Sequence, residues 1–114
     1  MIENKRKHFR LNSLNLSHVG VYENDLLVRQ GMGRTLNVSE SGILLETNFP
    51  INHKSNVLLS IGLEEDLVDI KGNIVHTILA GKDKYKTGIK INNITKPGLE
   101  IVKGYISDFT SKIN

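Results

Sequence analysis

Apolar and polar residues alternate along most of the chain, with the period of two that is typical of strands with one buried face. The first such stretch covers residues 9–21 and slips once near Asn12, which predicts a β-bulge. Further strand patterns cover residues 26–28, 35–38, 43–45, 57–61, 67–79 and 85–91. Turn-forming residues separate them and predict turns at residues 23–25, 30–33, 39–42 and 80–83, whereas Pro50 marks a loop. Six or seven short antiparallel strands predict a small closed barrel or a sandwich.

Only the C-terminal part follows a helical period. Its apolar residues are spaced by three or four positions and share one helical face: Leu99, Val102, Ile106, Phe109 and Ile113. Thr95 is a suitable N-cap and Pro97 fits a first turn, so we predict a helix at about residues 97–113. We expect its apolar stripe to cover one end of the β-structure; a helix that binds a partner is the alternative.

The whole-chain composition is that of one small globular domain. The 114 residues are 39% hydrophobic and 24% charged, which is enough to form a real core. The absence of cysteine excludes disulfides and thiolate metal sites. No apolar run approaches the roughly 18 residues that would span a bilayer, and the start lacks the apolar region of a secretory signal. We therefore expect a cytoplasmic protein without membrane insertion.

The polar residues form no catalytic or metal-binding motif that we recognise. The four histidines are scattered along the chain, without the paired spacing of metal ligands. Phosphate-binding loops, nucleophile elbows and dinucleotide-binding glycine patterns are also missing from the sequence. We expect a protein that is not an enzyme and that holds neither a cofactor nor a metal ion.

The positive charge of the chain is concentrated at its N-terminus. Four of the 15 lysine and arginine residues, but one of the 12 acidic residues, fall within positions 1–10, so this segment carries the net charge of +3 of the whole protein. We interpret residues 1–10 as a flexible basic arm attached to a domain of residues 11–114. The charge is local and only 5% of residues are aromatic, which favours a compact anionic ligand over a nucleic acid.

Two short motifs offer groups that suit a nucleotide. Arg6 and Arg10 are four positions apart, and an arginine fork can pair with phosphate, stack on a base or read the edge of guanine. Asn37 and Ser39 lie two apart in an extended segment and should place an amide and a hydroxyl on the same side. Gly42 then allows the turn to close and a ligand to approach the backbone. An ordinary turn, in which the Asn and Ser side chains cap their own backbone, is the alternative.

Taken together, the two motifs resemble the paired signature of the PilZ domain family, RxxxR followed by (D/N)xSxxG. Here RxxxR runs from Arg6 to Arg10, and NxSxxG begins at Asn37. Residues 88–91 are similar to a late strand motif of the family, and the resemblance extends over essentially the whole chain. It implies a stand-alone bacterial receptor for cyclic diguanylate (c-di-GMP), folded as a small antiparallel six-stranded β-barrel with a C-terminal helix.

The resemblance also implies a role for each motif residue. Arg6 and Arg10 would bind phosphate and guanine, and Asn37 and Ser39 would address the polar edge of a guanine. Gly42 would shape the loop between the strands. Lys5 is a further candidate that would either hold a second, stacked nucleotide or remain solvated.

The same resemblance predicts how the signal would leave the protein. The arm would fold over the barrel when the nucleotide binds, and an unidentified effector protein would read the changed surface, in the control of motility or biofilm formation. Two alternatives are a PilZ-like interaction module that binds no nucleotide and a small barrel that binds single-stranded nucleic acid. The sequence is compatible with a monomer and with a homodimer.

Overall fold

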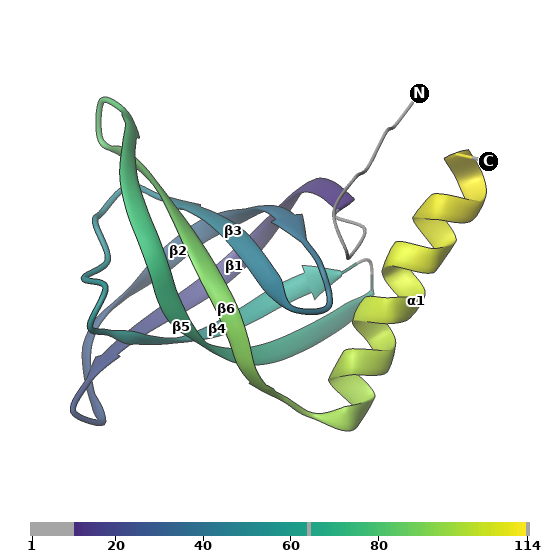
Figure 1. Cartoon of the computed structure of the whole chain (residues 1–114), viewed down its shortest axis with the longest axis horizontal. Helices are drawn as coiled ribbons and strands as arrows, with labels where there is room; N and C mark the ends of the chain where they lie inside the picture. The colour runs from purple at the N-terminus through teal and green to yellow at the C-terminus, as the bar shows by residue number, and fades with distance from the viewer. Residues whose placement is uncertain (1–10, 64, 114) are drawn as a thin grey trace.

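The chain folds into a closed antiparallel barrel of six strands, followed by one helix (Figure 1). The computed structural model describes residues 11–63 and 65–113, and the side chains of residues 15–63 and 65–107. The strands follow one another around the barrel in the order β1-β2-β3-β6-β5-β4. They are β1 (Leu11–Glu23), β2 (Leu26–Val38), β3 (Gly42–Thr47), β4 (Asn56–Leu63), β5 (Asp66–Gly81) and β6 (Lys84–Ile94), and the helix is α1 (Lys96–Ile113). The fold class predicted from the sequence is confirmed, whereas the predicted basic arm lies outside the described residues.

The interior of the barrel is filled by side chains at alternate strand positions. Leu45, Leu59 and Ile70 are completely buried, each with 0% exposure. Ser17 and Thr35 also point inward, and their hydroxyl oxygens lie 2.8 Å apart in a buried hydrogen bond that satisfies both groups. A six-stranded barrel is narrow enough for its own side chains to fill it. Any ligand site formed by the described residues must therefore lie on the outside.

Two hairpin turns were predicted correctly. Asn24 and Asp25 connect β1 to β2 with φ angles of 52° and 64°, which is the left-handed conformation that two-residue hairpin turns require. Lys82 and Asp83 connect β5 to β6, and Asp83 has a φ of 55°. Asn and Asp tolerate this conformation better than other residues with side chains, so the turn chemistry places these hairpins.

The turn predicted at residues 30–33 is wrong, because β2 continues through this segment. Its two glycines permit close packing and do not reverse the chain. A Cβ atom at Gly33 would lie 2.8 Å from the carbonyl oxygen of Glu46, and one at Gly31 would lie 3.1 Å from the ring of Phe49. Gly72 likewise lies within the continuous β5.

The predicted bulge near Asn12 is confirmed. The pairing of β1 with β2 shifts register between Asn12 and Asn15. Next to this shift, the side-chain amide of Asn15 donates a hydrogen bond of 2.9 Å to the carbonyl oxygen of Gly62. The bond connects β1 to β4 just beyond their last paired residues.

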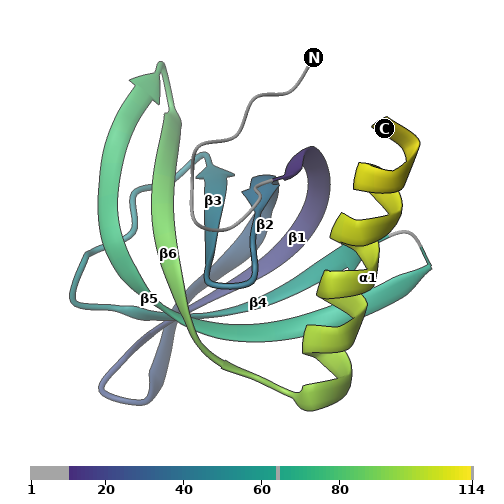
Figure 2. The same cartoon turned by 45° about the vertical axis from the view of Figure 1, so that its right-hand side comes forward.

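The helix begins as the sequence predicted and covers one end of the barrel (Figure 2). The hydroxyl oxygen of Thr95 accepts a hydrogen bond of 3.1 Å from the amide of Gly98, which confirms the N-cap. Val102 is completely buried in the core, and Tyr105 and Ile106 pack against its edge. Within the described part of the chain, no helix combines the length and the apolar character needed to cross a membrane.

Candidate functional site

The pairing of β1 with β2 places the residues that directly follow the first predicted motif opposite the second motif. Leu11, the first residue of β1, lies opposite Val38, the last residue of β2, and Asn12 lies opposite Asn37. In the sequence Arg10 directly precedes Leu11, and Ser39 directly follows Val38. Arg6, Arg10 and Lys5 themselves lie outside the described residues. Figure 2 shows the β2–β3 turn at the end of the barrel where α1 packs.

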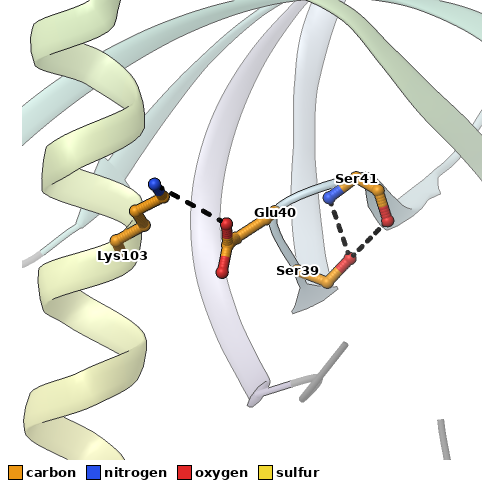
Figure 3. Close-up of polar contacts among 4 residues, drawn as sticks. All are labelled: Ser39, Glu40, Ser41 and Lys103. Carbon is orange, nitrogen blue, oxygen red and sulfur yellow. Dashed lines mark hydrogen bonds and ion pairs between the residues drawn. The ribbon is translucent and has the colours of Figure 1, made fainter. Parts of the chain in front are cut away.

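Ser39 organises the turn between β2 and β3 (Figure 3). Its side-chain oxygen accepts hydrogen bonds from the amides of Ser41 and Gly42, at 3.3 and 3.0 Å. Its hydroxyl also lies 3.2 Å from the carbonyl oxygen of Gly42, to which it can donate. The amide of Ser39 donates to the same carbonyl at 2.9 Å, which closes the turn. One buried side chain therefore holds the backbone of the whole turn.

The sequence left open whether the Asn37 and Ser39 side chains face a ligand or cap an ordinary turn, and the geometry of the turn bears on this question. Ser39 lies beyond the last residue of β2 and, like Val38 beside it, is completely buried, so the alternation of a strand does not continue to it. It caps its own turn, as the ordinary-turn alternative requires. Asn37 is half-buried within β2 and pairs with Leu44 of β3, next to a register shift. The two residues thus differ: Asn37 belongs to the barrel wall, and Ser39 shapes the turn that follows.

Replacing Ser39 with alanine is expected to lower the free energy of unfolding by about 1–2 kcal/mol, because two amides of the turn would lose their buried acceptor. Ser41→Ala is the matched control, since Ser41 is exposed and its hydroxyl makes a single described contact, 3.5 Å from that of Ser39. Urea denaturation followed by circular dichroism would compare the two variants with the wild type. Equal losses in both variants would show that Ser39 has no special role in the turn.

Charged side chains surround this turn. Glu40 and Lys103 form an ion pair at 4.0 Å that connects the turn to α1, with both side chains 44% exposed (Figure 3). Such an exposed pair contributes little stability. Lys90 of β6 is also exposed and is paired with Gly42, so its cation lies on the strand next to the turn.

The sequence interpretation gave neither lysine a role. A signal for Lys90 was present, because it is the outward residue between the apolar positions Ile89 and Ile91. The backbone supports this placement, since the amide of Ile91 donates a hydrogen bond of 3.0 Å to the carbonyl oxygen of Ser41. By contrast, no group of three or more His, Asp or Glu residues that could hold a metal ion occurs in the part of the chain that the structure describes.

Several solved structures share this fold. Bacillus subtilis MotI/DgrA, an inhibitor of motility, superposes with a TM-score of 0.75 and 13% identity over 98% of this chain and 55% of its own. The MrkH–c-di-GMP complex of K. pneumonia gives a TM-score of 0.71 and 12% identity over 98% and 55%. This chain thus spans about half the length of either protein. The PilZ domain of Escherichia coli YcgR with c-di-GMP gives a TM-score of 0.63 and 9% identity over 96% and 98%.

Sequence comparison identifies the family directly. The search of the curated proteins found no match. A family model does match, namely that of the PilZ domain, over residues 4–108. This match includes both motifs, all six strands and most of α1. The chain therefore belongs to the PilZ domain family.

Proposed function

We propose that this protein is a receptor for cyclic diguanylate, which it binds at the end of the β1–β2 strand pair. The observation that supports the proposal is the pairing of Leu11, the residue after RxxxR in the sequence, with Val38, the residue before the β2–β3 turn. The proposed ligand-binding residues are Arg6, Arg10, Asn37, Ser39 and Gly42, with Lys5 as a further candidate. Two of the structural neighbours, MrkH and the YcgR PilZ domain, were solved with this nucleotide, which supports the same ligand here.

The chemistry of the ligand fits these groups. Cyclic diguanylate carries two phosphodiester charges and two guanines, and arginine can pair with the former and stack on or hydrogen-bond to the latter. In our proposal Arg6 and Arg10 bind these groups, and Asn37 offers its amide to a guanine edge. Ser39 acts differently, because its oxygen is already occupied by the turn. It positions the backbone against which the nucleotide lies.

Binding would also provide a signal. We propose that the basic arm folds over the barrel when the nucleotide is bound, so that the surface presented to an effector protein changes. Lys103 connects the β2–β3 turn to α1, which gives the site a direct contact with the helix as well. The setting we propose is the bacterial cytoplasm, in the control of motility or biofilm formation. The name of MotI, an inhibitor of motility, is in keeping with this setting.

Isothermal titration calorimetry of the intact protein with cyclic diguanylate tests the proposal. We expect saturable binding, from which the number of bound nucleotides follows. Cyclic diadenylate is the matched control, because it has the same phosphodiester ring but lacks the guanine edge. Equal binding of both nucleotides would reduce the site to a phosphate-binding site. Absence of binding by a folded protein would leave an interaction module as the better description.

The family motif allows Asp or Asn at position 37, and the difference has a measurable consequence. A carboxylate would accept hydrogen bonds from guanine N1–H and N2–H₂ together, whereas the amide of Asn37 offers one acceptor. Asn37→Asp is therefore expected to bind cyclic diguanylate about tenfold more tightly, the gain from one charge-assisted hydrogen bond. Asn48→Asp, at an exposed position beyond β3, controls for the added charge. Tighter binding by the wild type would contradict the assigned role of Asn37.

A further inference from the structure

One strand extends beyond its neighbour at the end of the barrel opposite α1. β4 pairs with β5 from Leu63 opposite Asp66 to Asn56 opposite Asn73. Residues 74–81 of β5 then continue beside β6 alone, in the long hairpin that projects from the barrel in Figure 1. Among the residues that the structure describes, no strand pairs with the other edge of this segment. One row of backbone amides and carbonyls is therefore available for hydrogen bonding.

The sequence of this free edge is unusual for a surface. Residues 74–81 read IVHTILAG and contain no proline, lysine or acidic residue, which are the side chains that commonly protect an edge from pairing. Three large apolar side chains are mostly exposed, with Val75 at 62%, Ile78 at 53% and Leu79 at 68%. We therefore expect another polypeptide segment to cover this apolar edge when the protein functions.

A cleft of about 700 Å³ lies along this edge, between the β5–β6 hairpin and the loop that follows β3. Ile51 and His53 of the loop line one side, and the exposed residues of β5 line the other. The hydroxyl of Thr77 donates a hydrogen bond of 3.0 Å to the carbonyl oxygen of Ile51, which fixes the loop to the hairpin. The loop therefore has a defined position beside the hairpin.

A similar extension of β2 differs because it carries a charged residue. β3 pairs with β2 only from Arg34 onward, so residues 26–33 also extend beyond their neighbour. Here, however, the ring of Phe49 packs against Gly31, and the guanidinium of Arg29 lies 4.3 Å from the centre of the same ring. Residues 26–30 of β2 are exposed, but they include Arg29, a charged residue of the kind that protects an edge from pairing, whereas residues 74–81 of β5 contain no Lys, Arg, Asp or Glu.

The charges near the cleft indicate what fits it. Three exposed lysines lie on the loop and at the hairpin tip, where Asp83 is the one acidic residue: they are Lys54, Lys82 and Lys84, which we call the basic rim. Within the described residues none of the three forms an ion pair. A second copy of the chain would bring the same cations to the interface. An extended segment with acidic side chains would instead be attracted to them.

We propose that residues 74–81 of β5 form a docking site for an extended acidic segment of a partner protein. The segment adds a strand to the free edge through main-chain hydrogen bonds, places alternate apolar side chains against Val75 and Ile78, and directs its carboxylates to the basic rim. The inference rests on the proposed function because the docked partner would be the effector protein of the proposed receptor. Docking itself does not require the nucleotide.

Fluorescence anisotropy with a synthetic peptide tests the proposal without nucleotide. The probe is a labelled peptide of about eight residues that alternates glutamate with valine, which is long enough to pair with the free edge. We expect saturable binding that Ile78→Lys weakens by about tenfold or more, because one apolar contact is lost and a like charge joins the rim. Leu67→Lys is the matched control, since Leu67 is 71% exposed at the other end of β5. It should leave the affinity unchanged.

Two further probes show whether the peptide adds a strand. A peptide with central proline should lose binding, because it lacks the main-chain donor, and one with lysine in place of glutamate should bind more weakly. Amide chemical-shift changes should concentrate at residues 74–81. Equal binding of all three peptides, absence of binding, or shifts elsewhere would overturn the proposal. So would a wild-type dimer that Ile78→Lys dissociates, which would assign the edge to a second copy. None of these results bears on the nucleotide titration, so the two proposals fail separately.

Discussion

The variant Arg6→Ala/Arg10→Ala is expected to lose nearly all affinity for cyclic diguanylate. A hydrogen bond to a charged group contributes about 1.5–3 kcal/mol, so removing one from each arginine costs roughly 3–6 kcal/mol. That energy corresponds to a hundredfold to ten-thousandfold weaker binding by the usual relation, about tenfold per 1.4 kcal/mol. Calorimetric titration of the wild type and the variant under the same buffer and salt conditions would measure the difference.

Two matched variants separate the role of the arginine forks from that of charge. Lys82→Ala/Lys84→Ala removes the same amount of charge from the far end of the barrel and should leave nucleotide binding within about twofold of the wild type. Arg6→Lys/Arg10→Lys keeps the charge but removes the planar fork, and should bind weakly. If Lys82→Ala/Lys84→Ala lost as much affinity for the nucleotide as Arg6→Ala/Arg10→Ala, net charge and not the motif would govern binding. Full binding by the lysine replacements would contradict bidentate recognition.

The sequence predicted the fold well because most strands keep one apolar and one polar face. The alternation of apolar and polar residues identified the strands. Apolar residues spaced by three or four positions identified α1, and Thr95 was recognised as its N-cap. Asn and Asp at the hairpin tips marked the turns where positive φ angles occur. The strand pattern allowed a barrel or a sandwich, and the resemblance to the PilZ family favoured the closed barrel that the structure has.

The glycines were harder to interpret. A glycine that reverses the chain and one that permits a close contact look alike in a sequence, and the contact depends on residues far along the chain. Gly33 lies against the backbone of Glu46, a neighbour that only the β2–β3 register reveals. For this reason residues 30–33 were wrongly predicted to form a turn.

The candidate site was predictable in part. Candidate motif residues could be named from the sequence, and the β1–β2 register then shows that Asn12, two residues after Arg10 in the sequence, lies opposite Asn37. The burial of Ser39 could not be foreseen, because an exposed serine and a turn-capping serine have the same spacing to the following glycine. The free edge of β5 could not be predicted from the sequence either, because it exists only since β4 is shorter than the neighbouring β5.

Gly72→Ala is expected to lower the free energy of unfolding by about 3 kcal/mol, near the upper end of the usual cost of overpacking a core. Its Cβ atom would overlap Cγ2 of Ile89 and would lie 2.8 Å from the carbonyl oxygen of Lys90. The second contact is with backbone that pairs in the barrel, so a change of side-chain rotamer cannot relieve it. β5 or β6 would have to move, at the point where their register already shifts between Lys71 and Gly72.

Two other glycines provide the controls for this prediction. At Gly88 a Cβ atom would lie 2.7 Å from the exposed ring of His76, which can rotate away, so Gly88→Ala should cost about 1 kcal/mol or less. At Gly104, within α1, no atom lies within 4 Å, and alanine should stabilise the protein by about 0.4–1 kcal/mol. Urea denaturation should therefore rank the midpoints as Gly104→Ala above wild type, then Gly88→Ala, then Gly72→Ala. A Gly72→Ala midpoint close to that of the wild type would mean that the barrel wall yields at this bulge, and that the close approach of β5 and β6 is not required for the fold.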